Sequence, residues 1–523
     1  MTRPETLSAV GITLLLALRL PSLAHPAGAD QSLYIYVGQA IAAGGAPYVD
    51  AWDQKPPGVH VLYSLLWRIW PQESVVAAAD LAAAVGVSIV LVLIGRRMAM
   101  PGAGMIAGAL FALLSNPSLF RLSGVFVRGQ CETFISLYVA LALLLTLSPG
   151  RHWWPRAAAG VLLGLAVWTK YNAIAYALPI CLCMRLQPSR GDLRAFIAAL
   201  VLVGVLGLGF IAAHGALLDW RLATFNYNFD YAGTSYGGVT GFLSYAAWLP
   251  VRQARYDMLW FLGGAGVVAA LLRQRTRDSG RLALAWYAAA VVSIVLNGAR
   301  DLPQYFVQAA PALAWAAGAG LVAAWTSGRA IGRAATIAIV LAGLWRVGID
   351  APVAGGLRLA GLGGLADNVR FDLEHLRGRM DRSTYLSRFG GQRAQDKFVA
   401  RDVEALATRV RETTSPRDAI LVFGFSPGVY VKGGRQSASR FFWSRPVVIG
   451  FQAHRPGYGI GGLLRELTTQ RPALVALQKR DWGPGEPNSE AFFLEEPALA
   501  GWLHRHYRLE TDERLYSVWR RLE

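Results

Sequence analysis

Residues Asp30–Gly58 read DQSLYIYVGQAIAAGGAPYVDAWDQKPPG and form a polar loop after the first long apolar segment. The loop carries three carboxylates, Asp30, Asp50 and Asp53, and one cation, Lys55. A plain connector between two membrane helices needs none of these groups, because charge near a bilayer is costly unless it is used or paired. The loop therefore indicates chemistry at a membrane surface.

The sequence around this loop has the composition of a membrane protein. Of its 523 residues, 54% are hydrophobic and 16% are charged, whereas soluble proteins carry about 25% charged residues. A helix needs about 20 apolar residues to cross the hydrocarbon core, and the chain predicts a polytopic α-helical membrane protein with about eleven spans. The two segments that flank Tyr171 read equally well as one kinked span. The predicted spans are Leu7–Leu23, Val75–Ile94, Gly102–Leu119, Glu132–Leu147, Ala157–Lys170, Asn172–Met184, Leu193–Leu217, Met258–Leu272, Leu282–Asn297, Tyr305–Trp325 and Ala334–Val353.

The net charge of +18 is concentrated in alternate turns between these spans. Arginine-rich turns are typical of the cytoplasmic side. This pattern places the N-terminus in the cytoplasm and, with an odd number of spans, the Asp30–Gly58 loop and the C-terminal tail outside. Nucleic-acid binding would need one contiguous basic face with aromatic residues, so no nucleic-acid partner is expected. The arginine-rich turns are Arg96–Arg97, Arg151–Arg156, Arg185–Arg194, Arg273–Arg281 and Arg329–Arg333.

Two domains are predicted from the change in composition along the chain. Residues 1–353 form the membrane domain, with a first outer loop at 24–74, and residues 354–523 form a soluble extracytoplasmic α/β domain. Apolar runs at 419–424 and 473–477 read as buried strands within the second domain. The tail is long enough to bury a core of its own.

Two helices are expected along the outer surface within the first loop. Leu33, Tyr34, Val37 and Ile41 recur at helical spacing, and Gly44-Gly45 ends that stripe. Pro56-Pro57-Gly58 breaks the chain and begins a second, amphipathic helix.

A second outer loop, at 218–257, is rich in aromatic residues. Two interpretations stay open for it. The aromatic side chains form an interfacial belt at the lipid headgroups, or the segment is a mobile flap over a lipid or a sugar.

Ionisable residues inside the spans gather toward the outer side. Arg19 and Asp80 are best read as an ion pair between neighbouring helices, and His214 as a packing residue. Lys170 lies at an outer break between two short spans, where a cation suits a lipid phosphate. The alternative for Lys170 is simple snorkelling of its ammonium toward water.

These motifs resemble the membrane glycosyltransferases of the C fold (GT-C), in particular bacterial relatives of the protein O-mannosyltransferases and of the lipid A aminoarabinose transferase. The resemblance covers essentially the whole chain, and the first-loop motif is its most specific part. The motifs that carry the resemblance are Asp30-x-x-x-Tyr34, Ala46-Pro47-Tyr48-Val49-Asp50-x-Trp52-Asp53-Gln54-Lys55-Pro56-Pro57-Gly58, Trp168-Thr169-Lys170, Arg300-Asp301-Leu302-Pro303-Gln304-Tyr305-Phe306 and Val422-Phe423-Gly424.

The resemblance implies that a sugar moves from a polyprenyl-phosphate carrier to an acceptor at the outer face of a bacterial inner membrane. Its partners would be membrane lipids, the lipid-linked sugar, and a lipid, cell-wall glycan or protein acceptor. The catalytic acids of the family map to Asp30 and Glu132. Many relatives have Asp-Glu where this chain has Asp30-Gln31, and relatives often have His at the position of Gln304.

The chemistry of such a transfer assigns roles to the remaining candidates. Cations must stabilise the leaving phosphate, and a carboxylate must take the proton of the acceptor hydroxyl, for which Asp30 is the candidate. Direct displacement predicts inversion at the anomeric carbon. Donor and phosphate binding is assigned to Lys55, Lys170, Arg300 and Tyr305, and substrate binding to Tyr34, Asp50, Asp53 and Gln304.

Several alternatives stay open at this point. Asp50 and Asp53 bind sugar hydroxyls, orient Lys55 or only cap the loop. No His/Asp cluster with metal-ligand spacing occurs, so no metal ligand is assigned, although some relatives use a divalent cation such as Mg or Mn. A polymerase or ligase of polyprenyl-linked glycans, a lipid-sugar transporter and a pure binding protein are the competing functions. A transporter would more often show internal repeats and charges near the midplane.

Overall fold

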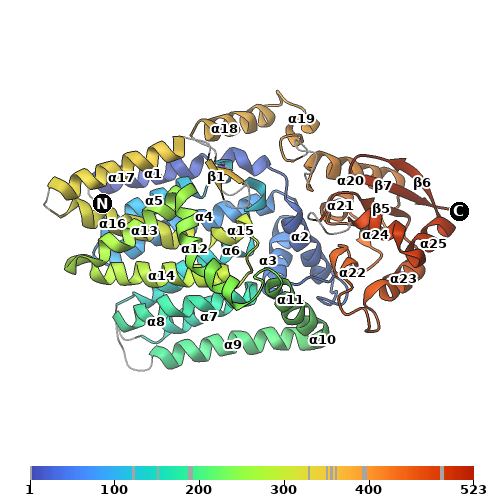
Figure 1. The fold of residues 1–523 in the computed structure, drawn as a ribbon, viewed down its shortest axis with the longest axis horizontal. Coiled ribbons are helices and arrows are strands. Elements are labelled where there is room, and N and C mark those ends of the chain that lie inside the picture. The colour runs from blue at the N-terminus through green and yellow to red at the C-terminus, as the bar shows by residue number, and fades with distance from the viewer. Residues whose placement is uncertain are drawn as a thin grey trace.

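The computed structural model describes residues 3–119, 124–149, 152–186, 192–327, 330–348, 351–353, 357–359, 362–390, 397–482 and 488–522. Figure 1 shows a large helical bundle, which holds the N-terminus, and a smaller part with a β-sheet, which holds the C-terminus. Helices α2 (Ala29–Ala42) and α3 (Pro57–Ile69) lie between these two parts. The first outer loop is therefore placed where the bundle and the sheet meet.

The bundle is built from helices of strongly apolar sequence. Within the described ranges, four helical segments are long and apolar enough to cross a membrane by length and composition: Thr6–Ala24, Val75–Arg97, Leu193–Ala213 and Pro303–Trp325. Five shorter apolar helices accompany them. The helical architecture is as predicted, whereas the number of eleven spans stays a prediction. The bundle helices are α1 (Arg3–Ala17), α4 (Val75–Arg97), α5 (Pro101–Leu114), α6 (Cys131–Thr146), α7 (Trp154–Thr169), α8 (Ala177–Leu186), α9 (Asp192–Ala213), α12 (Val239–Tyr256), α13 (Met258–Leu271), α14 (Arg277–Val295), α15 (Pro303–Val307), α16 (Ala310–Trp325) and α17 (Ala330–Gly348).

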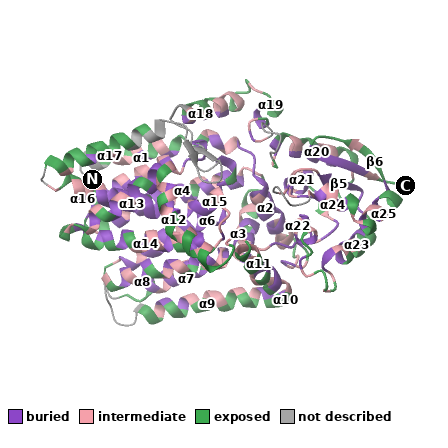
Figure 2. Cartoon of the chain, viewed as in Figure 1, coloured by how far each residue is buried: buried purple, intermediate pink, exposed green. Residues whose placement is uncertain are grey.

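The pattern of burial in the bundle suits a lipid environment. Figure 2 shows buried helices such as α13 and α16 inside, whereas α9 is largely exposed at the periphery. Apart from Arg194, the exposed residues of α9 are apolar, and a soluble protein rarely shows so long an apolar surface. They include Leu193, Ile197, Val201, Leu202, Val205, Leu206 and Leu208.

The predicted break at Lys170 is present. Lys170 has an extended backbone (φ −162°, ψ 125°) between α7 and a 3₁₀ helix at Tyr171–Tyr176. The Nδ2 of Asn172 donates to the carbonyl of Ser293, with 2.6 Å between the two atoms. This bond fastens the chain after the break to α14, so that Lys170 has a fixed place.

The last predicted span, Ala334–Val353, extends too far. Helix α17 ends at Gly348, and Ala351–Val353 forms a short strand, β1, that pairs antiparallel with β2 (Leu357–Leu359). Pro352 explains the difference, because a proline disfavours helical backbone at the residue before it.

Both helices predicted in the first outer loop are present. The chain turns at Gly44, whose φ of +90° is tolerated best by glycine, and α3 begins with Pro57. The segment 218–257 is mostly helical: α10 (Leu217–Arg221), a π-turn at Leu222–Asn226, α11 (Tyr227–Gly233) and α12.

The C-terminal part contains a five-stranded sheet with the order β4-β3-β5-β7-β6. Strands β3 and β5 are parallel and almost completely buried, which agrees with their continuous apolar sequences. The last two strands, β6 and β7, form a hairpin and pair antiparallel. The strands are β3 (Ala419–Phe423), β4 (Gln436–Ser437), β5 (Leu474–Gln478), β6 (Tyr507–Asp512) and β7 (Tyr516–Arg521). The helices are α18 (Leu362–Leu376), α19 (Arg382–Leu386), α20 (Ala400–Thr413), α21 (Gly428–Gly433), α22 (Arg445–Val448), α23 (Gly459–Gln470), α24 (Ser489–Glu495) and α25 (Pro497–His506).

Trp52 joins the first outer loop to the C-terminal part. Its backbone N–H donates to the carbonyl of Arg440, and its own carbonyl accepts from Nε1 of Trp443, both at 2.9 Å. The Trp52 ring is fully buried and packs against Trp443, Tyr227 and Phe451. The sheet domain therefore supports the loop that carries the candidate carboxylates.

Candidate active site

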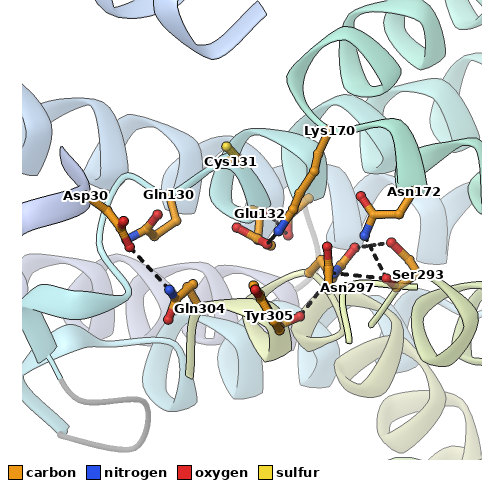
Figure 3. Close-up of polar contacts among 12 residues, drawn as sticks. Asp30, Gln130, Cys131, Glu132, Lys170, Asn172, Ser293, Asn297, Gln304 and Tyr305 are labelled. Carbon is orange, nitrogen blue, oxygen red and sulfur yellow. Dashed lines mark hydrogen bonds and ion pairs between the residues drawn. The ribbon is translucent and has the colours of Figure 1, made fainter. Parts of the chain in front are cut away.

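Asp30 is held by two amide side chains from distant parts of the sequence. Its Oδ2 accepts from Nε2 of Gln130, at 3.4 Å, and from Nε2 of Gln304, at 3.2 Å (Figure 3). Gln130 lies in the turn before α6, and Gln304 lies in α15. Asp30 itself lies in the first turn of α2, where the helix dipole favours a negative charge.

Gln130 is a site residue that the sequence did not reveal. Its Oε1 accepts from the hydroxyl of Tyr34 at 3.0 Å, and its Nε2 also donates to the carbonyl of Phe126 at 2.8 Å. These two partners fix the orientation of the amide, so that its N–H group points toward Asp30. The only sign in the sequence that Gln130 belongs to the site was its position two residues before Glu132.

Glu132 and Lys170, which were predicted separately, form a close ion pair. The Nζ of Lys170 lies 2.6 Å from Oε1 of Glu132 (Figure 3). Glu132 is almost completely buried in the first turn of α6, and the same Nζ lies 4.3 Å from the ring centroid of Tyr305. An aromatic face stabilises a cation by its quadrupole. The ammonium therefore lies between a carboxylate and a tyrosine.

Lys55 approaches the same region from the first outer loop. Its Nζ lies 5.5 Å from the ring centroid of Tyr34. The hydroxyl of Tyr48 donates to the Lys55 carbonyl at 2.9 Å and holds the loop in place. Asp53 is buried beside His60, with 3.1 Å between its Oδ2 and Nε2 of the imidazole. His60 is a second residue that the sequence analysis did not single out.

The electrostatic surroundings separate the two loop carboxylates. Burial raises the pKa of Asp30, and the nearby Lys55 opposes this only in part. Burial acts on Asp53 in the same direction, but Lys55 and His60 outweigh it and lower the pKa of Asp53. Burial disfavours the charge of Lys55, yet Asp53 and Asp30 outweigh it and raise the pKa of Lys55. Asp30 is therefore the loop carboxylate best suited to accept a proton.

Arg300 joins the site through one aromatic residue. Its guanidinium carbon lies 3.8 Å from the ring centroid of Tyr231, and its Nη2 donates to the Tyr231 carbonyl at 3.2 Å. The hydroxyl of Tyr231 lies near enough to that of Tyr305 for the two groups to interact electrostatically. The second outer segment therefore contributes to the site through α11.

Asp50 does not share the contacts of the other predicted site residues. It is exposed, and its Oδ2 accepts from the backbone N–H of Ala46 at 2.7 Å. This geometry is that of a loop cap, the alternative that the sequence left open for Asp50. The role in substrate binding predicted for it finds no support in these contacts.

The other expectations for charged residues inside the spans agree with the structure. Arg19 Nη2 lies 2.9 Å from Oδ2 of Asp80, and this predicted ion pair is buried. His214 Nδ1 lies 2.8 Å from the carbonyl oxygen of Phe210 in the preceding turn.

Gln31 has a structural reason to be an amide. Its Nε2 donates to the carbonyls of Val125 and Arg128, at 2.8 and 2.6 Å. A glutamate has no N–H group and would place a negative charge against two carbonyl oxygens. The difference from relatives with Asp-Glu at this point therefore follows from the contacts of Gln31.

The side chains at the site do not suit a divalent cation. Among the described residues, no group of three or more His, Cys, Asp or Glu side chains could hold a metal ion. Asp30 Oδ2 faces two amide N–H groups, and Glu132 faces the ammonium of Lys170. N–H groups repel a cation, whereas Mg²⁺ needs several oxygen ligands. No step of the reaction is therefore derived through a metal.

Comparisons with known proteins bear on the fold. No protein-family model and no curated protein matches the sequence. The solved structure of ArnT from Cupriavidus metallidurans bound to undecaprenyl phosphate is similar, with a TM-score of 0.57 and 14% identity over 98% of this chain and 97% of that chain.

The oligosaccharyltransferase from Archaeoglobus fulgidus in complex with Zn and sulfate gives a TM-score of 0.52 and 14% identity, over 90% of this chain and 68% of that chain. The same enzyme tethered with an acceptor peptide gives 0.53 and 13%, over 96% and 72%. At such identities the likeness concerns the fold. The chain therefore has the GT-C fold of membrane glycosyltransferases, as its motifs predicted.

Proposed function

We propose that this protein transfers a sugar from a polyprenyl-phosphate donor to an acceptor hydroxyl at the outer face of a membrane, with inversion at the anomeric carbon. The observation that carries the proposal is the convergence of a proton-accepting carboxylate, Asp30, with two lysines, Lys55 and Lys170, at one polar site next to apolar helices. The likeness to ArnT bound to undecaprenyl phosphate supports a lipid-linked donor.

The reaction follows from this arrangement in one step. The acceptor oxygen attacks the anomeric carbon, the bond from that carbon to the phosphate oxygen breaks, and the phosphate leaves with the electron pair. Asp30 takes the proton of the acceptor hydroxyl, and a positioned base is worth roughly 10²–10⁴-fold in rate. The proton therefore stays at a carboxylate whose pKa is already raised by burial.

Cations stabilise the charge that develops on the leaving phosphate. Lys170, Lys55 and Arg300 are the candidates, and Tyr305 places the ammonium of Lys170. The ion pair with Glu132 orients Lys170 within the buried site. A polyprenyl phosphate is a workable leaving group once its charge is compensated, so the mechanism needs no strong general acid.

The other site residues serve binding and organisation. Gln304 and Tyr34 contact the same network as Asp30, and we assign both to sugar binding. Asp53 keeps Lys55 charged and oriented. We assign residues 1–353 to the membrane domain and 354–523 to an extracytoplasmic domain, in a bacterial inner membrane. The acceptor is a lipid, a cell-wall glycan or a protein.

The test is transfer by the purified protein in lipid, with a panel of radiolabelled polyprenyl-phosphate sugars and a mixture of acceptors. Wild type is compared with Asp30→Asn and with Asp278→Asn, a matched change at an exposed carboxylate paired with Arg281. Turnover that is lost in Asp30→Asn and kept in Asp278→Asn supports the proposal. Equal turnover in all three proteins rejects Asp30 as the base.

A further inference from the structure

The turn that precedes α6 carries one group of the site and leads directly to a second. Residues Val125–Gln130 lead into α6 and include Gln130, which contacts Asp30, and Glu132 follows in the first turn of α6, where it binds Lys170. The position of this turn therefore determines the contact of Gln130 with Asp30 and that of Glu132 with Lys170. A group that holds the turn in position would consequently affect the reaction.

Gly129 is held on both sides of its peptide. Its N–H donates to Oδ1 of Asp80 at 3.1 Å, and its carbonyl accepts from the hydroxyl of Tyr63 at 2.6 Å. Its φ is +59°, and a Cβ there would lie 2.8 Å from both the Tyr63 oxygen and Cγ1 of Val76. Backbone conformation and space thus both restrict this position to glycine.

Asp80 is itself fixed by Arg19. Asp80 is 6% exposed and Arg19 is 4% exposed, and Nη2 of Arg19 lies 2.9 Å from Oδ2 of Asp80. Nη1 of Arg19 also donates to the hydroxyl of Ser115 at 2.9 Å. A buried charge pair is weak evidence for stability, because apolar residues of similar volume serve as well or better. The pair is better explained by the second carboxylate oxygen of Asp80, Oδ1, which accepts from the Gly129 N–H.

We propose that Asp80, oriented by Arg19, is a positioning residue that fixes the Gly129 amide and thereby holds Gln130 against Asp30 and Glu132 against Lys170. The role in catalysis rests on the proposed function, whereas the role in holding the turn does not. Asp80 touches no reacting atom and acts through the turn.

Loss of Asp80 has two consequences that a general loss of folding does not share. The Gly129 N–H would be left without its acceptor, so the turn would open more often to solvent exchange. Gln130 would also lose its place, and the hydrogen bond from Gln130 lowers the pKa of Asp30. The pKa of Asp30 would therefore rise further, and the acid limb of the rate profile would move to higher pH.

The test compares Asp80→Ala and Asp80→Asn with Asp481→Asn as a matched control. Asp481 is also buried, its Oδ1 accepts from the backbone N–H of Ser489 at 3.1 Å, and its Oδ2 accepts from the Ser489 hydroxyl. The full-length proteins are purified in lipid. Hydrogen exchange is followed in peptides that cover residues 125–132, and kcat, KM for the lipid-linked sugar and the pH profile are measured in parallel.

In Asp80→Ala we expect faster exchange in this segment, a fall in kcat on the order of 10²-fold, a smaller change in KM, and an acid limb at higher pH. Asp80→Asn keeps an oxygen acceptor and should show smaller effects, which also covers the case that the alanine variant fails to fold. Asp481→Asn should leave the exchange of 125–132 and the pH profile of transfer unchanged.

Two results would overturn the inference. Exchange at 125–132 that is equal in wild type and both Asp80 variants would show that Asp80 does not hold the turn, whether or not the protein transfers sugar. Faster exchange together with an unchanged kcat and pH profile would show that the turn does not control the site. Absence of transfer by wild type, with exchange as expected, would reject the proposed function and the catalytic part of this inference while keeping the structural part.

Discussion

Replacement of Lys170 by methionine removes the cation from the buried ion pair with Glu132. Lys170→Met keeps much of the side-chain volume and lets the partner carboxylate of Glu132 stay where it is. The two atoms of the pair are 2.6 Å apart, and the Glu132 side chain is 1% exposed. The single change therefore leaves a buried carboxylate without its counter-charge.

The expected loss of stability follows from that burial. Removing one partner of a buried ion pair costs about 3–5 kcal/mol, whereas removing both is often close to neutral. Lys170→Met and Glu132→Gln should each lower the unfolding free energy by an amount in this range. The double variant should be destabilised by clearly less than the sum of the two.

The expected effect of Lys170→Met on donor binding differs from its effect on stability. A hydrogen bond to a charged group contributes about 1.5–3 kcal/mol, which corresponds to a rise in donor KM of about 10- to 150-fold when Lys170 no longer holds the phosphate. The double variant removes the same cation, so its stability should recover while its donor KM stays high. The use of the acceptor should change less than the use of the donor.

The assay combines thermal unfolding in lipid with initial rates at varied donor, for wild type, both single variants and the double variant. Two results would refute the reasoning. Strictly additive losses of stability would show that the pair is not coupled, and a donor KM that recovers in the double variant would show that Lys170 does not bind the phosphate.

Further outcomes are expected from other parts of the structure. Because the pKa of Asp30 is raised by burial, activity should increase as pH rises through a midpoint above the ordinary value of about 3.9; a pH–rate profile with a midpoint at or below that value would contradict this. Gln31→Glu loses two donated hydrogen bonds and should lower the unfolding temperature, while a wild-type value would reject the role of the amide. Burial raises the pKa of Asp481 to about 6, so the folded state binds this proton more tightly than the unfolded state does. The proton contributes up to about 3 kcal/mol of stability, which is present below about pH 4 and lost as pH rises through about 6. Asp481→Asn should flatten this pH dependence of the unfolding free energy in a series of unfolding curves. Treatment with EDTA should leave transfer unchanged, because the N–H donors at Asp30 and Glu132 do not suit a metal; loss of transfer that Mg²⁺ or Mn²⁺ restores would show otherwise.

Much of the fold could be predicted because it follows from local sequence patterns. Strands β3 and β5 are short continuous apolar runs, and a strand buried on both faces requires that pattern. Helices α2 and α3 could be placed because Gly44 and Pro57 mark their ends. The last span was placed too far along the chain because hydropathy does not register the backbone restriction before Pro352.

The site could be predicted only in part, because its contacts join residues that are far apart in the sequence. Charged candidates such as Asp30, Glu132 and Lys170 were visible, since a charge near the membrane is unusual. Gln130 was not, because a neutral amide carries no such signal and its role arises from contact with residues about a hundred positions away. The pairing of Asp53 with His60 likewise depends on the fold of the loop.

The most direct measurement is the binding and turnover of one radiolabelled polyprenyl-phosphate sugar by wild type and by Asp30→Asn, each purified in lipid. The proposed mechanism predicts that both proteins bind the donor with similar affinity, since the cations are unchanged, and that only wild type transfers the sugar. Transfer by Asp30→Asn at the wild-type rate would contradict the role of Asp30, and absence of donor binding by wild type would contradict a lipid-linked sugar as the substrate.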